Sequence, residues 1–184
     1  MGLRDKVISS VDAAVADIPD GATVLIGGFG GSGLPTALVE GLVRRGIKGL
    51  TVIANNAAFG ELATKGGIRK LICSYPIGPS SRPFLEALEA GKVEVELVPQ
   101  GTLVERIRAG GAGLGGVLTP VGLDTEFAVG QQEVWVNGRR YLLAPAIRAD
   151  YALIKAAVAD RWGNLVYRHA ARNFNPIMAM AADV

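Results

Sequence analysis

Short apolar runs alternate with helix-like segments along the chain as far as Gly113. Four short segments rich in apolar residues have glycine, proline or asparagine at one or both ends, and the fourth alternates Val and Leu with Glu, as is typical of strands. These predicted strands cover residues 24–26, 50–54, 68–74 and 93–98. The segments predicted as helices cover residues 5–17, 35–45, 83–90 and 102–109. Strands that alternate with helices favour a mostly parallel sheet flanked by helices, and so predict an α/β fold.

The pattern changes after Gly115, where the sequence predicts an additional β-hairpin. Residues 133–136 and 139–143 are rich in β-prone residues and flank Asn137-Gly138. Asn-Gly is preferred in the two-residue turn of a hairpin because both residues readily adopt a positive φ. A core strand, a turn and a helix start are expected at 151–156, 160–164 and 175–182. No repeat or linker interrupts the sequence, so we predict a single domain over residues 1–184.

Composition and charge narrow the classes of function. The chain has 19 basic and 17 acidic residues, a balance that argues against a nucleic-acid partner. No apolar run reaches the roughly 18 residues of a membrane helix, and residues 1–10 lack the apolar stretch of a signal peptide. One cysteine and one histidine leave no basis for an internal disulfide or a zinc cluster. We therefore expect a cytoplasmic protein without a metal site or a membrane partner.

Amide side chains follow two of the predicted strands, at the edge where α/β sheets place ligands. Asn55 and Asn56 end the second strand, and their amides can orient a carboxylate or a carbonyl. Simple turn formation explains these two residues equally well. Gln100 follows the fourth strand and could donate to an oxyanion. From spacing alone, a helix cap or a turn is the better explanation of Gln100.

A glycine-rich segment at 27–35 joins a strand to a helix, so that its backbone N–H groups can face a ligand. Gly28, Gly30 and Gly33 match the G-x-G-x-x-G pattern of dinucleotide sites. Such a site also requires an acidic residue about 20 residues later, where this chain has Asn55-Asn56. A tight turn that packs the helix against the strand is the alternative to a binding role.

Other residues with reactive side chains have simpler explanations. Cys73 lies on a predicted buried strand and is expected in the core rather than as a nucleophile. His169 is not accompanied by a G-x-S-x-G elbow, so it is expected to be a surface or core residue. Arg168 and Arg172 could clamp an anion or form a solvated basic stretch.

Residues 20–35 resemble the first signature of the family I CoA-transferases. That pattern is Asp-Gly, two residues, three apolar residues, Gly-Gly-Phe, three residues, Gly, one residue and Pro, and every fixed position is met. Further similar segments follow in order at 50–57, 69–75, 94–113, 150–156, 160–165 and 172–175. The similarity covers nearly the whole chain and is closest to A subunits of the 3-oxoadipate, acetoacetate and succinyl-CoA:3-oxoacid type.

The resemblance implies a CoA-transferase-like fold and an enzyme that moves CoA between succinyl-CoA, or another acyl-CoA, and a 3-oxoacid such as 3-oxoadipate or acetoacetate. In this family a glutamate on the B subunit is the nucleophile that attacks the thioester and then holds CoA as a glutamyl thioester. The Glu-Asn-Gly type segment of that glutamate is absent from this sequence. The resemblance therefore implies an A–B heterodimer, or a heterotetramer of two such pairs. It implies no metal or redox cofactor, since CoA enters as part of the acyl-CoA substrate.

The resemblance also assigns functions to individual residues. Gln100 matches the glutamine of the family's oxyanion hole, and Asn55 and Asn56 match asparagines that line the acyl pocket. The glycine loop matches a wall of the site and part of the packing between the two halves of the enzyme. Its candidate substrate-binding residues are Gly28, Phe29, Gly30 and Gly33.

The sequence departs from the family pattern in two places. Segment 59–67 is shorter than usual, which bears on the shape of the acyl pocket. The sequence ends at Val184, where the family continues, so the subunit is short there or the sequence is truncated.

Two other classes of function remain: a non-catalytic ligand-binding or regulatory module on the same fold, and a sugar-phosphate isomerase. An isomerase would need acid/base groups near the strand ends, where the sequence shows no convincing set and leaves only Lys155 and Asp150 open.

Overall fold

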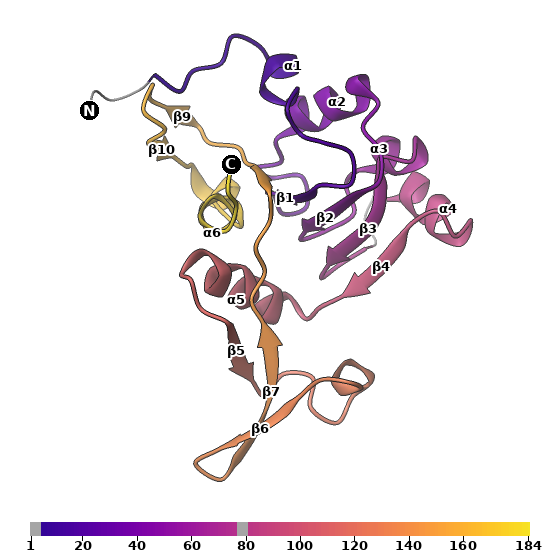
Figure 1. The fold of residues 1–184 in the computed structure, drawn as a ribbon, viewed down its shortest axis with the longest axis vertical. Helices are drawn as coiled ribbons and strands as arrows, with labels where there is room; N and C mark the ends of the chain where they lie inside the picture. The colour runs from indigo at the N-terminus through magenta and orange to yellow at the C-terminus, as the bar shows by residue number, and fades with distance from the viewer. Residues whose placement is uncertain (1–4, 77–80) are drawn as a thin grey trace.

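The computed structural model describes residues 5–76 and 81–184, and its centre is a five-stranded parallel sheet (Figure 1). The strand order is β4-β3-β2-β1-β8. The strands are β1 (Thr23–Ile26), β2 (Leu50–Ala54), β3 (Ile68–Cys73), β4 (Glu94–Leu97) and β8 (Tyr151–Leu153). The predicted α/β class is therefore confirmed. Because β8 pairs with β1, the last third of the chain returns to the first strand.

Helices cover both faces of this sheet, in two layers of buried side chains. The helices are α1 (Val11–Ala14), α2 (Thr36–Arg45), α3 (Gly60–Thr64), α4 (Arg82–Glu89), α5 (Gln100–Gly111) and α6 (Asn175–Met180). Val24 and Ile26 belong to the layer under α2, α3 and α4, whereas Leu25 belongs to the layer under α5 and α6. Successive side chains of a strand point to opposite faces. Both faces of β1 and β2 are thus buried, which explains why these two strands are almost entirely apolar.

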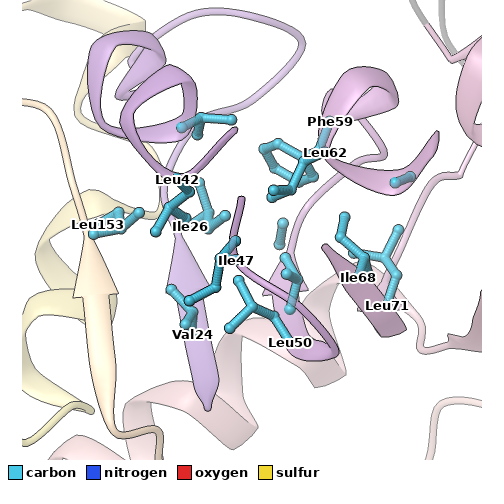
Figure 2. Close-up of a cluster of buried hydrophobic side chains, with 14 of the residues drawn as sticks. Val24, Ile26, Leu42, Ile47, Leu50, Phe59, Leu62, Ile68, Leu71 and Leu153 are labelled. Atoms are coloured by element: carbon cyan, nitrogen blue, oxygen red, sulfur yellow. The ribbon is translucent and has the colours of Figure 1, made fainter. Parts of the chain in front are cut away.

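Leu42 of α2 lies in the middle of the first layer, close to Ile26 of β1 (Figure 2). Its side chain is 0% exposed. We expect Leu42→Ala to lower the free energy of unfolding by about 2–5 kcal/mol, because the substitution removes buried methyl groups and leaves a cavity. Urea denaturation of the purified chain measures this difference.

The matched control is Leu114→Ala, since Leu114 is 51% exposed. This surface substitution should change the free energy of unfolding by no more than roughly 0.5 kcal/mol. Equal effects of the two substitutions would contradict the placement of α2 over the sheet.

A second, antiparallel sheet extends from the body next to α5 (Figure 1). It contains β5 (Gly116–Thr119), β6 (Glu133–Val136) and β7 (Arg139–Pro145), in the order β5-β7-β6. Asn137 and Gly138 have φ values of 49° and 73°, as the two-residue turn requires. The predicted hairpin is therefore confirmed, and β5 joins it as a third strand that the sequence pattern did not reveal.

Some predicted boundaries were wrong. The first helix covers only Val11–Ala14, because Ser10 caps it by accepting a hydrogen bond from the Ala13 N–H, and Val7 and Ile8 before it are 71% and 58% exposed. The helix predicted at 102–109 begins at Gln100 and continues through Gly111. The strand predicted at 151–156 ends at Leu153. Helix α3 was not predicted from the sequence.

The remaining elements are short. The predicted turn at 160–164 joins β9 (Val158–Ala159) to β10 (Leu165–Val166), and the 3₁₀ turns are Glu126–Ala128 and His169–Ala171. In the described part of the chain, no helix is long and apolar enough to span a membrane. Residues 1–4 of the segment judged not to be a signal peptide lie outside the described residues.

Candidate functional site

The carboxyl ends of three neighbouring strands bring together residues from distant parts of the sequence. Asn55 and Asn56 follow β2, Ser74 follows β3, and Gln100 begins α5 three residues after the end of β4. The Gln100 side chain donates from Nε2 to Oδ1 of Asn55 at 2.6 Å, across 45 residues of sequence. The two amides that were selected separately from the sequence are thus in direct contact.

Asn55 is the fixed centre of this group. Its side chain is 3% exposed, and its Oδ1 accepts a second hydrogen bond from Ser74 Oγ at 2.7 Å. Its backbone carbonyl accepts from the N–H groups of Ser74 and Tyr75 at 3.1 and 3.0 Å. Hydrogen bonds to both the side chain and the backbone carbonyl therefore hold Asn55 in place, and buried polar groups are in general hydrogen-bonded in this way.

Gln100, in contrast, is exposed and reaches this centre from the first turn of α5. An amide nitrogen has two N–H donors. Asn55 accepts from one of them, and no described residue accepts from the other. The second N–H is therefore available to an oxygen atom of a bound ligand.

The glycine loop at 27–35 is attached to the same edge. Its Gly30 N–H donates to Asn56 Oδ1 at 3.2 Å. Phe29 and Ser32 exchange two backbone hydrogen bonds of 2.9 and 3.0 Å, which close a tight turn with Phe29 49% exposed. The loop thus lies beside the amides, with an aromatic side chain accessible to solvent.

Asn175 of α6 anchors the base of this loop, and its role was missed from the sequence. Its side chain is 0% exposed, and its Nδ2 donates to the carbonyl groups of Gly33 and Ala171 at 3.1 and 3.0 Å. Its Oδ1 accepts from the Lys155 N–H at 2.9 Å. The C-terminal segment therefore fixes the loop from 142 residues away in sequence.

Space for a ligand is present next to Gln100. A hollow of about 500 Å³ lies between α5 and β5, with Gln100 at its wall. Val104, Leu118 and Val121 form an apolar part of its lining, and the ion pair of Glu105 and Arg108 forms a charged part. The buried hydroxyl of Thr102 also lines it and forms no hydrogen bond within the described residues. An apolar group can therefore lie beside the Gln100 amide.

Comparison with known proteins identifies the family. Residues 8–184 match the family model described as coenzyme A transferase. The chain belongs to this family. It is 49% identical to the A subunit of 3-oxoadipate CoA-transferase from Pseudomonas putida, over 97% of this chain and 79% of that protein. It is 48% identical to the alpha subunit of acetate CoA-transferase from Escherichia coli K12, over 99% of this chain and 84% of that protein.

A solved structure shows the same fold. Glutaconate coenzyme A-transferase from Acidaminococcus fermentans superposes with a TM-score of 0.84 over 95% of this chain and 63% of that chain. At 21% sequence identity, this likeness concerns the fold alone. The family resemblance of the sequence and its CoA-transferase-like fold are therefore both confirmed.

The thiol of Cys73 is not positioned for catalysis. Cys73 is 0% exposed at the end of β3, and burial raises the pKa of its thiol to about 11. An unperturbed thiol has a pKa of about 8.5, and the thiolate is the reactive form. The prediction that Cys73 belongs to the core is confirmed.

We expect iodoacetamide at pH 8 to alkylate Cys73 at least roughly a hundredfold more slowly in the folded chain than in the urea-unfolded chain, since the protonated thiol predominates more strongly when folded. Mass spectrometry of timed samples measures both rates. Similar rates would mean that the thiol is accessible and ionised in the folded state.

The acid/base pair considered for an isomerase does not form. Asp150 precedes β8 and accepts from the Thr23 N–H at 2.7 Å, at the amino end of β1. Lys155 follows β8 and therefore lies toward the opposite edge of the sheet. The two residues therefore flank β8 at its opposite ends.

Glu94 and Glu96 form an ion-pair network along the strands. Lys70 of β3 contacts Glu94 at 3.1 Å and Glu96 at 2.9 Å, and Arg106 contacts Glu96 at 3.3 Å. Burial acts to raise the pKa of Glu96, but the hydrogen bond and charge of Lys70 together with Arg106 lower it overall. Glu94 is exposed, whereas Glu96 is half-buried.

The basic residues near the C-terminus are exposed. Arg168, His169 and Arg172 all have exposed side chains, and His169 starts a 3₁₀ turn with φ of 46°. Among the described residues, no group of three or more His, Cys, Asp and Glu side chains is arranged to hold a metal ion.

Proposed function

We propose that this chain is the A subunit of a CoA-transferase that moves CoA between succinyl-CoA, or another acyl-CoA, and a 3-oxoacid such as 3-oxoadipate or acetoacetate. The observation that carries the proposal is the contact between Gln100 and the buried Asn55, in a chain 49% identical to the A subunit of a 3-oxoadipate CoA-transferase. The names of the relatives indicate which acids the enzyme acts on. The Gln100 and Asn55 amides indicate how the site stabilises the reaction.

The reaction needs a carboxylate nucleophile, which we assign to a glutamate of a partner B subunit. Its oxygen adds to the thioester carbon, and loss of the CoA thiolate leaves an acyl-glutamyl anhydride. The thiolate then attacks the glutamyl carbonyl, which releases the donor acid and forms a glutamyl-CoA thioester. An acceptor carboxylate repeats both steps in reverse. Segments 27–35, 55–58, 74–76 and 99–101 of this chain form the strand-end edge and contain no Asp or Glu.

Each addition step places negative charge on a carbonyl oxygen, and the second N–H of Gln100 can donate to it. Such a donor stabilises the transition state more than the ground state when it is held in place beforehand. Asn55 provides that restraint, because its Oδ1 accepts the other N–H of Gln100 at 2.6 Å. Asn56, Phe29 and the glycine loop would then form the wall beside the acyl group.

The proposal includes an A–B heterodimer, or a heterotetramer of two such pairs, since the relatives are named as A or alpha subunits. CoA enters as part of the acyl-CoA substrate, and no step of the scheme requires a metal or a redox cofactor. The chain acts as one domain, and the cytoplasm, where acyl-CoA is available, is its proposed location.

Co-expression with the B subunit encoded in the same genome tests this function. The purified pair should convert succinyl-CoA and acetoacetate to succinate and acetoacetyl-CoA. After incubation with acyl-CoA alone, mass spectrometry should locate a CoA thioester on a glutamate of the B subunit. Each of the two chains by itself should be inactive.

The alternative is a non-catalytic ligand-binding or regulatory module on the same fold. Turnover by the isolated chain, or a stable pair that exchanges no CoA with any 3-oxoacid, would contradict the proposed function. In the second case, binding of acyl-CoA without thioester formation would favour the module.

A further inference from the structure

Ser74 lies at the carboxyl end of β3 and contacts the centre of the amide group. Its hydroxyl oxygen is 2.7 Å from Asn55 Oδ1 and 3.1 Å from the Asn55 backbone carbonyl. One hydroxyl proton serves these two acceptors, and the shorter distance favours the side-chain oxygen. Ser74 is itself half-buried.

The Asn55 amide needs such a restraint to hold a single orientation. Rotation about its terminal torsion is soft and has no sharp minima. Its side chain is 3% exposed, so water does not readily replace a lost partner. Of the two hydrogen bonds that Oδ1 accepts, one comes from Gln100 and the other from Ser74. Removal of the hydroxyl would leave the exposed Gln100 side chain and the long 3.5 Å contact from Asn55 Nδ2 to Asn56 Oδ1 as the hydrogen bonds that orient the Asn55 amide.

Gln100 depends on Asn55 in turn. Its side chain has three rotatable bonds and is exposed, and Asn55 is the partner that holds it. A glutamine N–H can stabilise an oxyanion only if it already points to the place where charge develops. The order of dependence thus runs from Ser74 through Asn55 to Gln100.

We propose that Ser74 is a positioning residue for CoA transfer: its hydroxyl orients Asn55, and Asn55 orients the N–H of Gln100 that meets the oxyanion. This inference rests on the proposed function. Ser74 acts through the two amides and does not touch the substrate. It should therefore affect turnover more than substrate binding.

The test uses the A–B complex with Ser74→Ala, Ser74→Thr and, as a matched surface control, Ser9→Ala, since Ser9 is exposed. Ser74→Ala should lower kcat about tenfold with KM changed by less than roughly twofold, the scale of one lost hydrogen bond in the transition state. Ser74→Thr retains the hydroxyl and should keep most of the turnover. Ser9→Ala should match the wild type.

A double-mutant cycle separates positioning from a general structural effect. In a Gln100→Ala background, Ser74→Ala should lower kcat by less than about twofold, because the group that it positions is already gone. An unchanged kcat in the single Ser74→Ala variant, or a full tenfold loss in the Gln100→Ala background, would overturn the inference.

A second measurement does not depend on turnover. The side-chain amide signals of Gln100 in NMR, assigned by their loss in Gln100→Ala, should be shifted from those of the exposed Gln131 and Gln132. In Ser74→Ala the Gln100 signals should move toward those of the two exposed glutamines. If they do not move, Ser74 does not position Gln100. Inactive wild-type complex with this NMR response intact would instead contradict the proposed function.

Discussion

Replacing Gln100 with alanine is expected to lower the kcat of the A–B complex by about 10²–10³-fold, the usual cost of removing one oxyanion donor. Gln100 is exposed, and within the described part of the chain its side chain forms one hydrogen bond, to Asn55. The substitution therefore removes the donor without disturbing the core. Steady-state rates with succinyl-CoA and acetoacetate measure the loss, and size-exclusion chromatography should show the complex still assembled.

Gln132→Ala is the matched control, because Gln132 is also exposed but lies beyond the parallel sheet. It should leave kcat unchanged. Gln100→Glu provides a second comparison, since a carboxylate has the same shape but repels an oxyanion. We expect its loss of turnover to equal or exceed that of alanine. Unchanged turnover in Gln100→Ala would show that this residue does not stabilise the oxyanion.

Gly33→Ala should destabilise the chain and abolish transfer, because two separate constraints act at this position. Gly33 has φ of 70°, a conformation that costs an L-residue roughly 1–2 kcal/mol. A Cβ there would also lie 2.4 Å from the Ala171 carbonyl oxygen and 2.8 Å from Asn175 Nδ2. Those atoms hold the glycine loop against the C-terminal segment. We expect the free energy of unfolding to fall by roughly 3 kcal/mol or more.

Gly46→Ala separates the two constraints. Gly46 ends α2 with φ of 75°, and a Cβ there would meet no atom within 4 Å. Only the backbone cost of roughly 1–2 kcal/mol should remain, with turnover at 25 °C unchanged. Thermal or urea unfolding of both variants gives the comparison. If the two substitutions cost the same, the contact of the loop with Ala171 and Asn175 does not constrain the site.

Local patterns in the sequence were enough to predict most of the sheet. Periodicity and bounding residues act over a few positions, so β1 and β2 were predicted within one residue of their bounds and the Asn137-Gly138 turn was predicted correctly. The same reasoning extended the first helix too far. It could not show that Val7 and Ile8 have no apolar surface to pack against. It also missed β5, because pairing with β7 joins segments that are distant in sequence.

The sequence by itself determined which strand ends carry amides and where the glycine loop lies. Only the tertiary structure decided which of these groups touch. Parallel pairing of β2, β3 and β4 brings Ser74 and Gln100 to Asn55, across 19 and 45 residues of sequence. Asn175 reaches Gly33 across 142 residues because β8 pairs with β1 and α6 follows it. Contacts between residues so far apart in sequence depend on strand order and register, which local periodicity does not encode.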